Sequence, residues 1–171
     1  MKRLYFCRHG LSQFGLEGKW AGSSETPLAP GGQKQAKTAG AQARELHIDY
    51  VLSSPLLRAQ ETARIIAQEI GYPENKIELS DLFVERDFGE LEGTPYDPAR
   101  TDFDKVRGIE PVEELFERVR LALKHIETID ADTILVVSHG SFGRALRHVI
   151  NPDIPFYGSK KFENAKIVRL I

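Results

Sequence analysis

Two histidines and two arginines stand just beyond short apolar runs, which is where the catalytic side chains of α/β enzymes are placed. Arg8 and His9 follow the first run, His139 follows the strongest one, and Arg58 lies just beyond a third. Two guanidinium groups near one another repel, so a site that holds both favours an anion with several oxygens, such as phosphate. A histidine beside them is suited to nucleophilic or acid–base chemistry.

The elements that must position these side chains follow from the apolar patterning. Short apolar runs predict strands over 4–7, 50–53, 77–80, 133–137 and 165–171, the last alternating like an edge strand. Apolar residues at helical spacing predict helices over 30–46, from the Ser54-Pro55 cap to Gly71, from Pro111 past Ile126, and over 141–150. The stretch 11–26 is predicted to be a loop and 83–109 an irregular excursion.

Strands that alternate with helices predict an α/β fold with a largely parallel sheet. We expect a three-layer sandwich in which helices flank both faces of that sheet. Ligands of such sheets bind beyond the carboxyl ends of the strands, so His9, Arg58 and His139 are predicted to share one rim. Glu85 belongs to the irregular excursion, which we expect to fold over the same rim.

Length and charge exclude several classes of protein. The 171 residues suit a single domain over 1–171, and the formal net charge of −2 shows no basic excess of the kind that nucleic acids or anionic membranes attract. The single cysteine, Cys7, leaves no disulfide framework and no cysteine-based metal site. No apolar window is long enough for a signal peptide or a membrane span, so we expect a cytoplasmic protein. The oligomeric state stays open.

Five blocks of sequence, in this order, resemble the histidine phosphatase superfamily, whose fold is phosphoglycerate-mutase-like. The resemblance covers nearly the whole chain and rests on Arg8-His9-Gly10, Thr26-Pro27-Leu28 with Gly32 and Gln35-Ala36, the stretch from Ser53 to Ala63, the stretch from Glu85 to Gly93, and Val137-Ser138-His139-Gly140. It implies a phosphatase that needs no metal and no other cofactor. The implied partner is a phosphorylated small molecule.

The resemblance also implies a role for each principal residue. His9 corresponds to the nucleophile that takes the phosphoryl group, and Arg8, Arg58 and a protonated His139 correspond to the groups that hold its oxygens. Glu85 corresponds to the acid that protonates the leaving oxygen. These roles agree with the chemistry, because phosphoryl transfer depends on fixed donors around a charge spread over three oxygens. Neighbouring cations also disfavour the imidazolium form of a histidine nucleophile.

Some positions depart from the family pattern. Gly22 and Gly140 match places where the backbone approaches the substrate, but Gly15 stands where the family commonly has an asparagine. That change removes a hydrogen bond to phosphate. We still expect turnover, either slower or assisted by Ser12 or Ser23.

Four alternatives compete with a phosphatase of alcohol or sugar phosphate esters. A cofactor-dependent phosphoglycerate mutase would carry a longer insertion than the 17 residues between Gly93 and Pro111. A protein phosphohistidine phosphatase would not need Glu85, because imidazole is readily protonated as it leaves. A serine hydrolase built on Ser141 would need glycine where His139 stands. The fourth alternative is a non-catalytic binding module.

The remaining reactive side chains have simpler interpretations. Cys7 lies in an apolar strand and is expected to be inert. His47, His125 and His148 are expected to be structural or solvated. Trp20, in the first loop, is predicted to pack on the substrate; the alternative is that it closes the loop.

Overall fold

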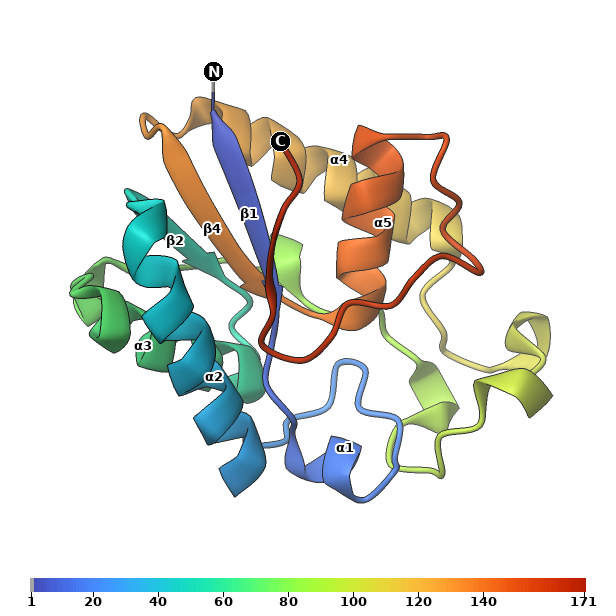
Figure 1. Cartoon of the computed structure of the whole chain (residues 1–171). Helices are drawn as coiled ribbons and strands as arrows, with labels where there is room; N and C mark the ends of the chain where they lie inside the picture. The colour runs from blue at the N-terminus through green and yellow to red at the C-terminus, as the bar shows by residue number, and fades with distance from the viewer. Residues whose placement is uncertain (1) are drawn as a thin grey trace.

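The computed structural model describes residues 2–171, which form one five-stranded sheet in the order β3-β2-β4-β1-β5 (Figure 1). The strands are β1 Arg3–Arg8, β2 Tyr50–Ser53, β3 Glu78–Leu79, β4 Thr133–Ser138 and β5 Ile167–Arg169. β1 to β4 pair in parallel, and the edge strand β5 runs antiparallel to β1. The predicted mostly parallel sheet is therefore confirmed.

Two pairs of helices cover the sheet, one pair on each face (Figure 1). α2 (Pro30–Ala43) and α3 (Leu57–Ile70) pack on one face, and α4 (Val112–Thr128) and α5 (Gly140–Ile150) pack on the other. The short helix α1 (Gln13–Leu16) lies in the loop after β1. The three-layer sandwich predicted from the sequence is thus confirmed.

The central strand β4 shows why the layers form. Every residue of β4 is buried. Because successive side chains of a strand point to opposite faces, Ile134 and Val136 pack with apolar residues of α4 and α5. Leu135 and Val137 pack with apolar residues of α2 and α3. A strand covered on both faces reads as a continuous apolar run, which is the pattern found in the sequence.

The structure differs from the predicted elements in two places near the site. The loop over 11–26 contains α1, whose N-terminus is capped by Ser12 because its hydroxyl accepts from the Gly15 amide at 3.1 Å. The predicted cap at Ser54 is wrong: α3 begins at Leu57, and its N-cap residue is Leu56. The Ser54 hydroxyl instead hydrogen-bonds His139 and the Leu56 amide.

The excursion over 83–109 contains only short 3₁₀ turns, in agreement with the irregular structure predicted for it. Trp20 connects it to the first loop. The indole ring is 5% exposed, and its centroid lies 4.7 Å from that of Phe88, 4.4 Å from Tyr96 and 5.9 Å from Phe103. Trp20 therefore closes the loop against the excursion, and it also borders the cavity described below.

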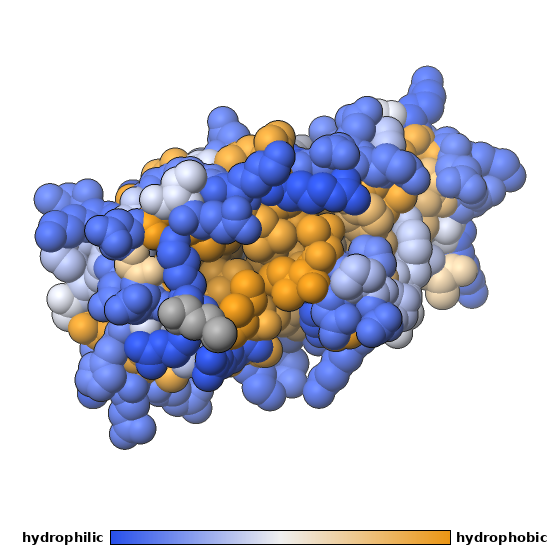
Figure 2. All heavy atoms as spheres, turned by 90° about the horizontal axis from the view of Figure 1, so that it is seen from above, coloured by the Kyte–Doolittle hydropathy of each residue, from blue (hydrophilic) through white to orange (hydrophobic). Residues whose placement is uncertain are grey.

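The end of the sheet at which the parallel strands begin shows a different surface. Seen from above the view of Figure 1, hydrophobic atoms gather in the middle of this face and hydrophilic residues surround them (Figure 2). Within residues 2–171, no helix combines the length and apolar character that a bilayer crossing requires.

Candidate active site

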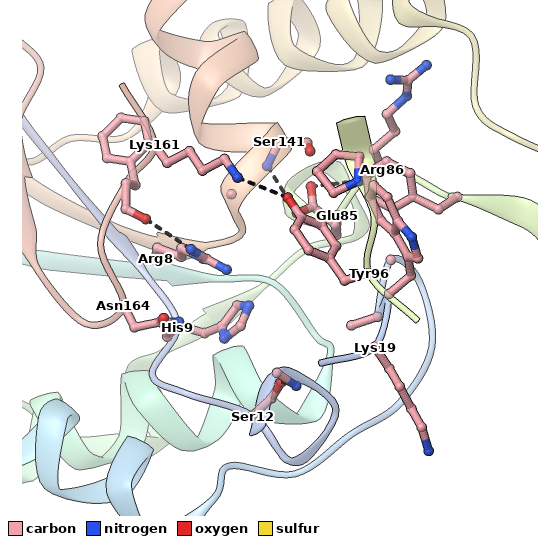
Figure 3. A pocket seen from close by; sticks show the side chains of 18 of the residues that line it. Arg8, His9, Ser12, Lys19, Glu85, Arg86, Tyr96, Ser141, Lys161 and Asn164 are labelled. Atoms are coloured by element: carbon pink, nitrogen blue, oxygen red, sulfur yellow. Dashed lines mark hydrogen bonds between the residues drawn. The ribbon is translucent and has the colours of Figure 1, made fainter. Parts of the chain in front are cut away.

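The carboxyl ends of three neighbouring strands bring the predicted residues together. β4 lies between β2 and β1, with Ser138 paired to Arg8 and Val137 paired to Ser53. The residues that follow these strands therefore meet at one rim, as the sequence predicts. Arg8, His9, Arg58 and Gly140 line a cavity of about 420 Å³ at this end of the sheet, whereas the completely buried His139 is not among the lining residues. Figure 3 shows the cavity from close by.

His9 is buried at the floor of this cavity, with a defined tautomer. Its Nδ1 lies 2.7 Å from the Gly10 carbonyl oxygen, and Arg58 Nε donates to its Nε2 at 3.3 Å. Nδ1 therefore carries the proton, and Nε2 carries the lone pair. Burial, and then the charges of Arg58 and Arg8, lower the pKa of His9 well below its ordinary value of 6.5. The ring is thus kept neutral, as a nitrogen nucleophile must be.

Arg58 is a fully buried cation on the first turn of α3, where the sequence placed it. Its guanidinium donates to the Gly22 carbonyl at 2.6 Å and to the Ser24 carbonyl at 2.8 Å. Burial lowers its pKa to about 10, so it stays charged at neutral pH. The two carbonyls fix the orientation of the guanidinium while Nε remains directed at His9.

The loop that holds Arg58 is anchored by Glu92, a residue that sequence reasoning did not single out. The Glu92 carboxylate accepts from the Ser23 amide at 2.7 Å, from the Ser23 hydroxyl at 3.0 Å and from the Ser24 hydroxyl. Burial acts to raise the pKa of Glu92, but the hydrogen bonds from Ser24, Ser23 and Phe88 bring it below its usual value. The sequence signal for Glu92 is its place in the block from Glu85 to Gly93, one of the five blocks that resemble the superfamily.

Gly22 itself has no room for a side chain. Its φ is 51°, in the left-handed region, and a Cβ would lie 2.1 Å from a Glu92 carboxylate oxygen. Gly22 lines the cavity and offers its carbonyl to Arg58. Its expected place beside the substrate is therefore compatible with the structure. Its carbonyl oxygen also helps to orient the Arg58 guanidinium.

His139 is completely buried, and its ring centroid lies 5.2 Å from that of His9. Its Nε2 is 2.8 Å from the Ser54 hydroxyl oxygen, which also accepts from the Leu56 amide. A hydroxyl has one hydrogen and two lone pairs, so Ser54 can donate to Nε2, with the His139 proton on Nδ1, or accept from Nε2–H. Within residues 2–171, Nδ1 has no hydrogen-bond partner.

The charged form expected for His139 is disfavoured by its surroundings. Burial, then Arg58, His9 and Arg8, lower its pKa well below 6.5. These surroundings favour a neutral ring in the absence of phosphate, an anion whose charge favours the imidazolium form.

Arg8 and Gly140 lie side by side next to these histidines. Arg8 donates to the Phe162 carbonyl at 3.0 Å, and its buried Nε has no partner among residues 2–171. A Cβ on Gly140 would lie 3.5 Å from that Nε. Two buried nitrogens, Arg8 Nε and His139 Nδ1, are therefore without a partner among residues 2–171, and unpaired buried polar groups are rare in native proteins.

Glu85 is buried at the N-terminus of α5. Its Oε2 accepts from the Ser141 amide at 3.0 Å, and its Oε1 accepts from the amides of Phe142 at 3.0 Å and Arg86 at 2.9 Å. The excursion thus brings Glu85 to the rim, and its side chain lines the same cavity as His9.

Ser12 and Gly15 also line the cavity. Ser12 is 3% exposed, and its hydroxyl caps α1. Its position at the wall is compatible with the role expected for it, although the hydroxyl oxygen already accepts one hydrogen bond. Ser23 is not among the cavity-lining residues, because its hydroxyl is bound to Glu92.

The structure adds wall residues that sequence reasoning missed. Arg144 of α5 borders the cavity. Lys161 and Asn164 of the C-terminal segment and Tyr96 of the excursion also border it (Figure 3). Asn164 donates to the His9 carbonyl at 2.9 Å. No pattern marked these residues, because they resemble ordinary surface side chains.

Other side chains agree with their simpler interpretations. Cys7 is fully buried, and burial raises the pKa of its thiol to about 12. Ser141, the candidate serine nucleophile, bonds through its hydroxyl only to Arg144 among residues 2–171, at 3.3 Å, and therefore has no general base. Within the same residues, no group of three or more His, Cys, Asp or Glu is arranged to hold a metal ion.

A cluster of N–H donors at the rim of an α/β sheet, around a neutral histidine, suits an enzyme that handles phosphate. Comparison with known proteins agrees: residues 4–171 match the histidine phosphatase superfamily (branch 1), and the chain belongs to this superfamily. It is a hydrolase of the histidine phosphatase type, as the sequence motifs predict.

Individual relatives cover most of the chain. It is 31% identical to an uncharacterized phosphatase, PhoE, of Bacillus subtilis over 96% of this chain and 86% of the relative. It is 34% identical to a probable phosphoglycerate mutase, GpmB, of Salmonella choleraesuis over 82% of this chain and 70% of the relative. A solved phosphoserine phosphatase of Entamoeba histolytica, in complex with phosphoserine, is 25% identical with a TM-score of 0.81, covering all of this chain and 91% of that one.

Proposed function

We propose that this protein is a metal-independent phosphomonoesterase that hydrolyses phosphate esters of small alcohols or sugars through a phosphohistidine intermediate. One observation carries the proposal. His9 is buried and neutral, its Nδ1–H is held by the Gly10 carbonyl, and its unprotonated Nε2 accepts a long hydrogen bond of 3.3 Å from Arg58 Nε, which the phosphoryl group would replace. This is the arrangement that a nitrogen nucleophile needs.

In the first step, Nε2 of His9 forms a bond to phosphorus as the ester P–O bond breaks. Glu85, in its protonated form, gives its proton to the departing alcohol oxygen. In this proposal Arg58, the unpaired Nε–H of Arg8 and His139, with a proton on Nδ1, hold the three phosphoryl oxygens. Ser12, Gly22 and Gly140 complete the wall around them.

In the second step, water attacks the phosphorus of phosphohistidine and the N–P bond breaks. The Glu85 carboxylate accepts the proton that the water loses, and inorganic phosphate is released. His9 returns to its neutral form, and Glu85 is again protonated for the next substrate. The cycle thus needs no group other than the side chains at the rim.

Two features support an alcohol ester over a phosphorylated protein histidine. Glu85 supplies the proton that an alkoxide needs and that an imidazole leaving group does not. His9 is only 6% exposed and lies in a cavity of about 420 Å³, a volume suited to a small substrate. The related phosphoserine phosphatase acts on a molecule of this kind.

A phosphoglycerate mutase is the second candidate, and the relationship to the probable mutase GpmB favours it. The short excursion argues against a mutase, because only 17 residues separate Gly93 from Pro111 and a mutase would carry a longer insertion there. A mutase would interconvert 2- and 3-phosphoglycerate in the presence of 2,3-bisphosphoglycerate faster than it releases phosphate. The reverse ratio supports the phosphatase.

The deciding experiment compares His9→Ala with the native protein and with a histidine control, His47→Asn. His47 is exposed and has a φ of 50°, which asparagine tolerates. We expect His9→Ala to abolish phosphate release and His47→Asn to retain it. Phosphoenzyme trapped from the native protein should be labile in acid and stable in alkali. Turnover by well-folded His9→Ala contradicts the mechanism.

A further inference from the structure

The cavity is far more basic than the chain as a whole. The chain has a net charge of −2, yet only one carboxylate, Glu85, lines the cavity within residues 2–171. The cations that line it are Arg8, Lys19, Arg58, Arg86, Arg144 and Lys161. Such a concentration of positive charge indicates a ligand with several negative charges.

Four of these cations have assigned partners. Arg58 is held by two carbonyls, Arg86 donates to the Glu110 carbonyl at 2.9 Å, and Lys19 pairs with Glu17 at 2.6 Å. Arg8 is assigned to the phosphoryl group. Arg144 and Lys161 remain, and neither has a carboxylate within 4.0 Å among residues 2–171.

Arg144 is placed one helical turn beyond Gly140, on the same side of α5. Its guanidinium donates one hydrogen bond, to the Ser141 hydroxyl at 3.3 Å, and lies 5.2 Å from the Phe156 ring centroid. Burial lowers the pKa of Arg8, and the positive charge of Arg144 is near enough to lower it further. Two cations that repel one another across a cavity are stabilised by an anion bound between them.

Lys161 lies in the C-terminal segment that follows α5 and also lines the cavity. Its Nζ donates to the Tyr96 hydroxyl at 3.1 Å and lies 5.3 Å from the Tyr96 ring centroid, so it joins the C-terminal segment to the excursion (Figure 3). An ammonium group has three donors, and only one of them is engaged within residues 2–171. Lys161 therefore has donors left for a ligand in the outer part of the cavity.

We propose that Arg144 and Lys161 form a subsite for a second anionic group, a carboxylate or a second phosphate, on the leaving-group part of the substrate. The inference rests on the proposed phosphatase function. Arg8 and Arg58 balance the two charges of the phosphate dianion, and Arg144 and Lys161 balance the second anion. The substrate class is then a small phosphate ester that carries another acidic group.

A three-carbon series tests the subsite. Glycerol 3-phosphate has no second anion, 3-phosphoglycerate has a carboxylate, and glycerol 1,3-bisphosphate has a second phosphate. Their Kd values are measured by calorimetry on His9→Ala, which should not consume them. We expect one or both anionic ligands to bind at least about tenfold more tightly than glycerol 3-phosphate, the usual worth of one charge-assisted hydrogen bond.

Substitutions on the same background assign the effect to residues. Lys161→Met and Arg144→Met should each bring the affinity ratio down by about tenfold. Lys160→Met is the matched control, since Lys160 is exposed and does not line the cavity, and it should leave the ratio as it was.

Equal Kd values across the series, or equal effects of the Lys160 and Lys161 substitutions, overturn the subsite. Hydrolysis by the native enzyme is measured separately with p-nitrophenyl phosphate. Absence of that turnover counts against the proposed function, whereas the binding ratios still report on the subsite.

Discussion

The hydroxyl oxygen of Ser54 lies 2.8 Å from Nε2 of His139, and both side chains are fully buried. Ser54 follows β2 and His139 follows β4, so the contact joins two neighbouring strand ends. The Ser54 hydroxyl also accepts from the Leu56 amide, and His139 is its other side-chain contact. We propose that Ser54 donates its hydrogen to Nε2 and is a positioning residue that keeps the His139 proton on Nδ1.

Ser54→Ala should release this constraint and let the His139 proton move to Nε2. We expect kcat/KM to fall about tenfold, the worth of one hydrogen bond to a developing charge. The ¹⁵N chemical shifts of the His139 ring give the direct readout, with Nδ1 protonated in the native protein and a mixture of tautomers in the variant. Ser53→Ala is the control, since the Ser53 hydroxyl donates to the Ser54 carbonyl instead. Native His139 protonated on Nε2 contradicts the assignment.

Arg58→Ala should weaken phosphate and vanadate together by about 2–5 kcal/mol, the cost of removing a buried charge partner. Calorimetry on both anions measures this. The control is Arg64→Ala on the same helix, because Arg64 forms an exposed ion pair with Glu74 and stands away from the cavity. Unchanged phosphate affinity in Arg58→Ala would mean that its guanidinium only anchors the Gly22–Ser24 loop.

Glu85→Gln should slow phosphoenzyme formation from alkyl phosphates by roughly 10²–10⁴-fold, the range of general acid–base help. Aryl phosphates should lose much less, since a phenolate leaves without a proton. The amide also turns one acceptor oxygen into a donor beside backbone N–H groups, so a thermal melt must accompany the rates. Equal losses for both substrates would show that Glu85 shapes the site and does not donate a proton.

Stability should fall in mild acid because of the two buried histidines. Their pKa values are lowered in the folded protein, so the unfolded chain binds more protons as the pH drops below 6.5. Each ring then removes about 1.4 kcal/mol from the free energy of unfolding per pH unit, down to its folded pKa. Urea titrations at pH 6 and pH 5 measure the slope. His9→Ala should reduce it, and an identical slope in the variant would contradict the cause.

Much of the fold could be predicted because its strands and helices follow from local patterns of apolar residues. β1 and β4 are continuous apolar runs that are buried on both faces, and the alternation with helices forces parallel pairing. Once these strands are neighbours, His9, Arg58 and His139 must lie near one another.

The parts that could not be predicted depend on the path of segments without periodicity. Lys161 borders the cavity because the path of the C-terminal segment brings it there, and Arg144 borders it from α5. Ser54 looked like a helix cap because serine before proline is a common helix start, and the start of α3 at Leu57 leaves its hydroxyl to His139. These relationships appear only when all the segments are in place.

The wall of the cavity is built from two kinds of structure. The groups proposed to hold the phosphoryl oxygens stand on strand ends or on the first turn of a helix, where the core fixes them, whereas Glu85, Tyr96 and Lys161 stand on irregular segments. Loops tolerate substitution and insertion far better than core elements do. A lineage can therefore exchange Tyr96 or Lys161 without moving the groups that hold phosphate, so this architecture offers a route by which one ancestral catalyst diversifies into many.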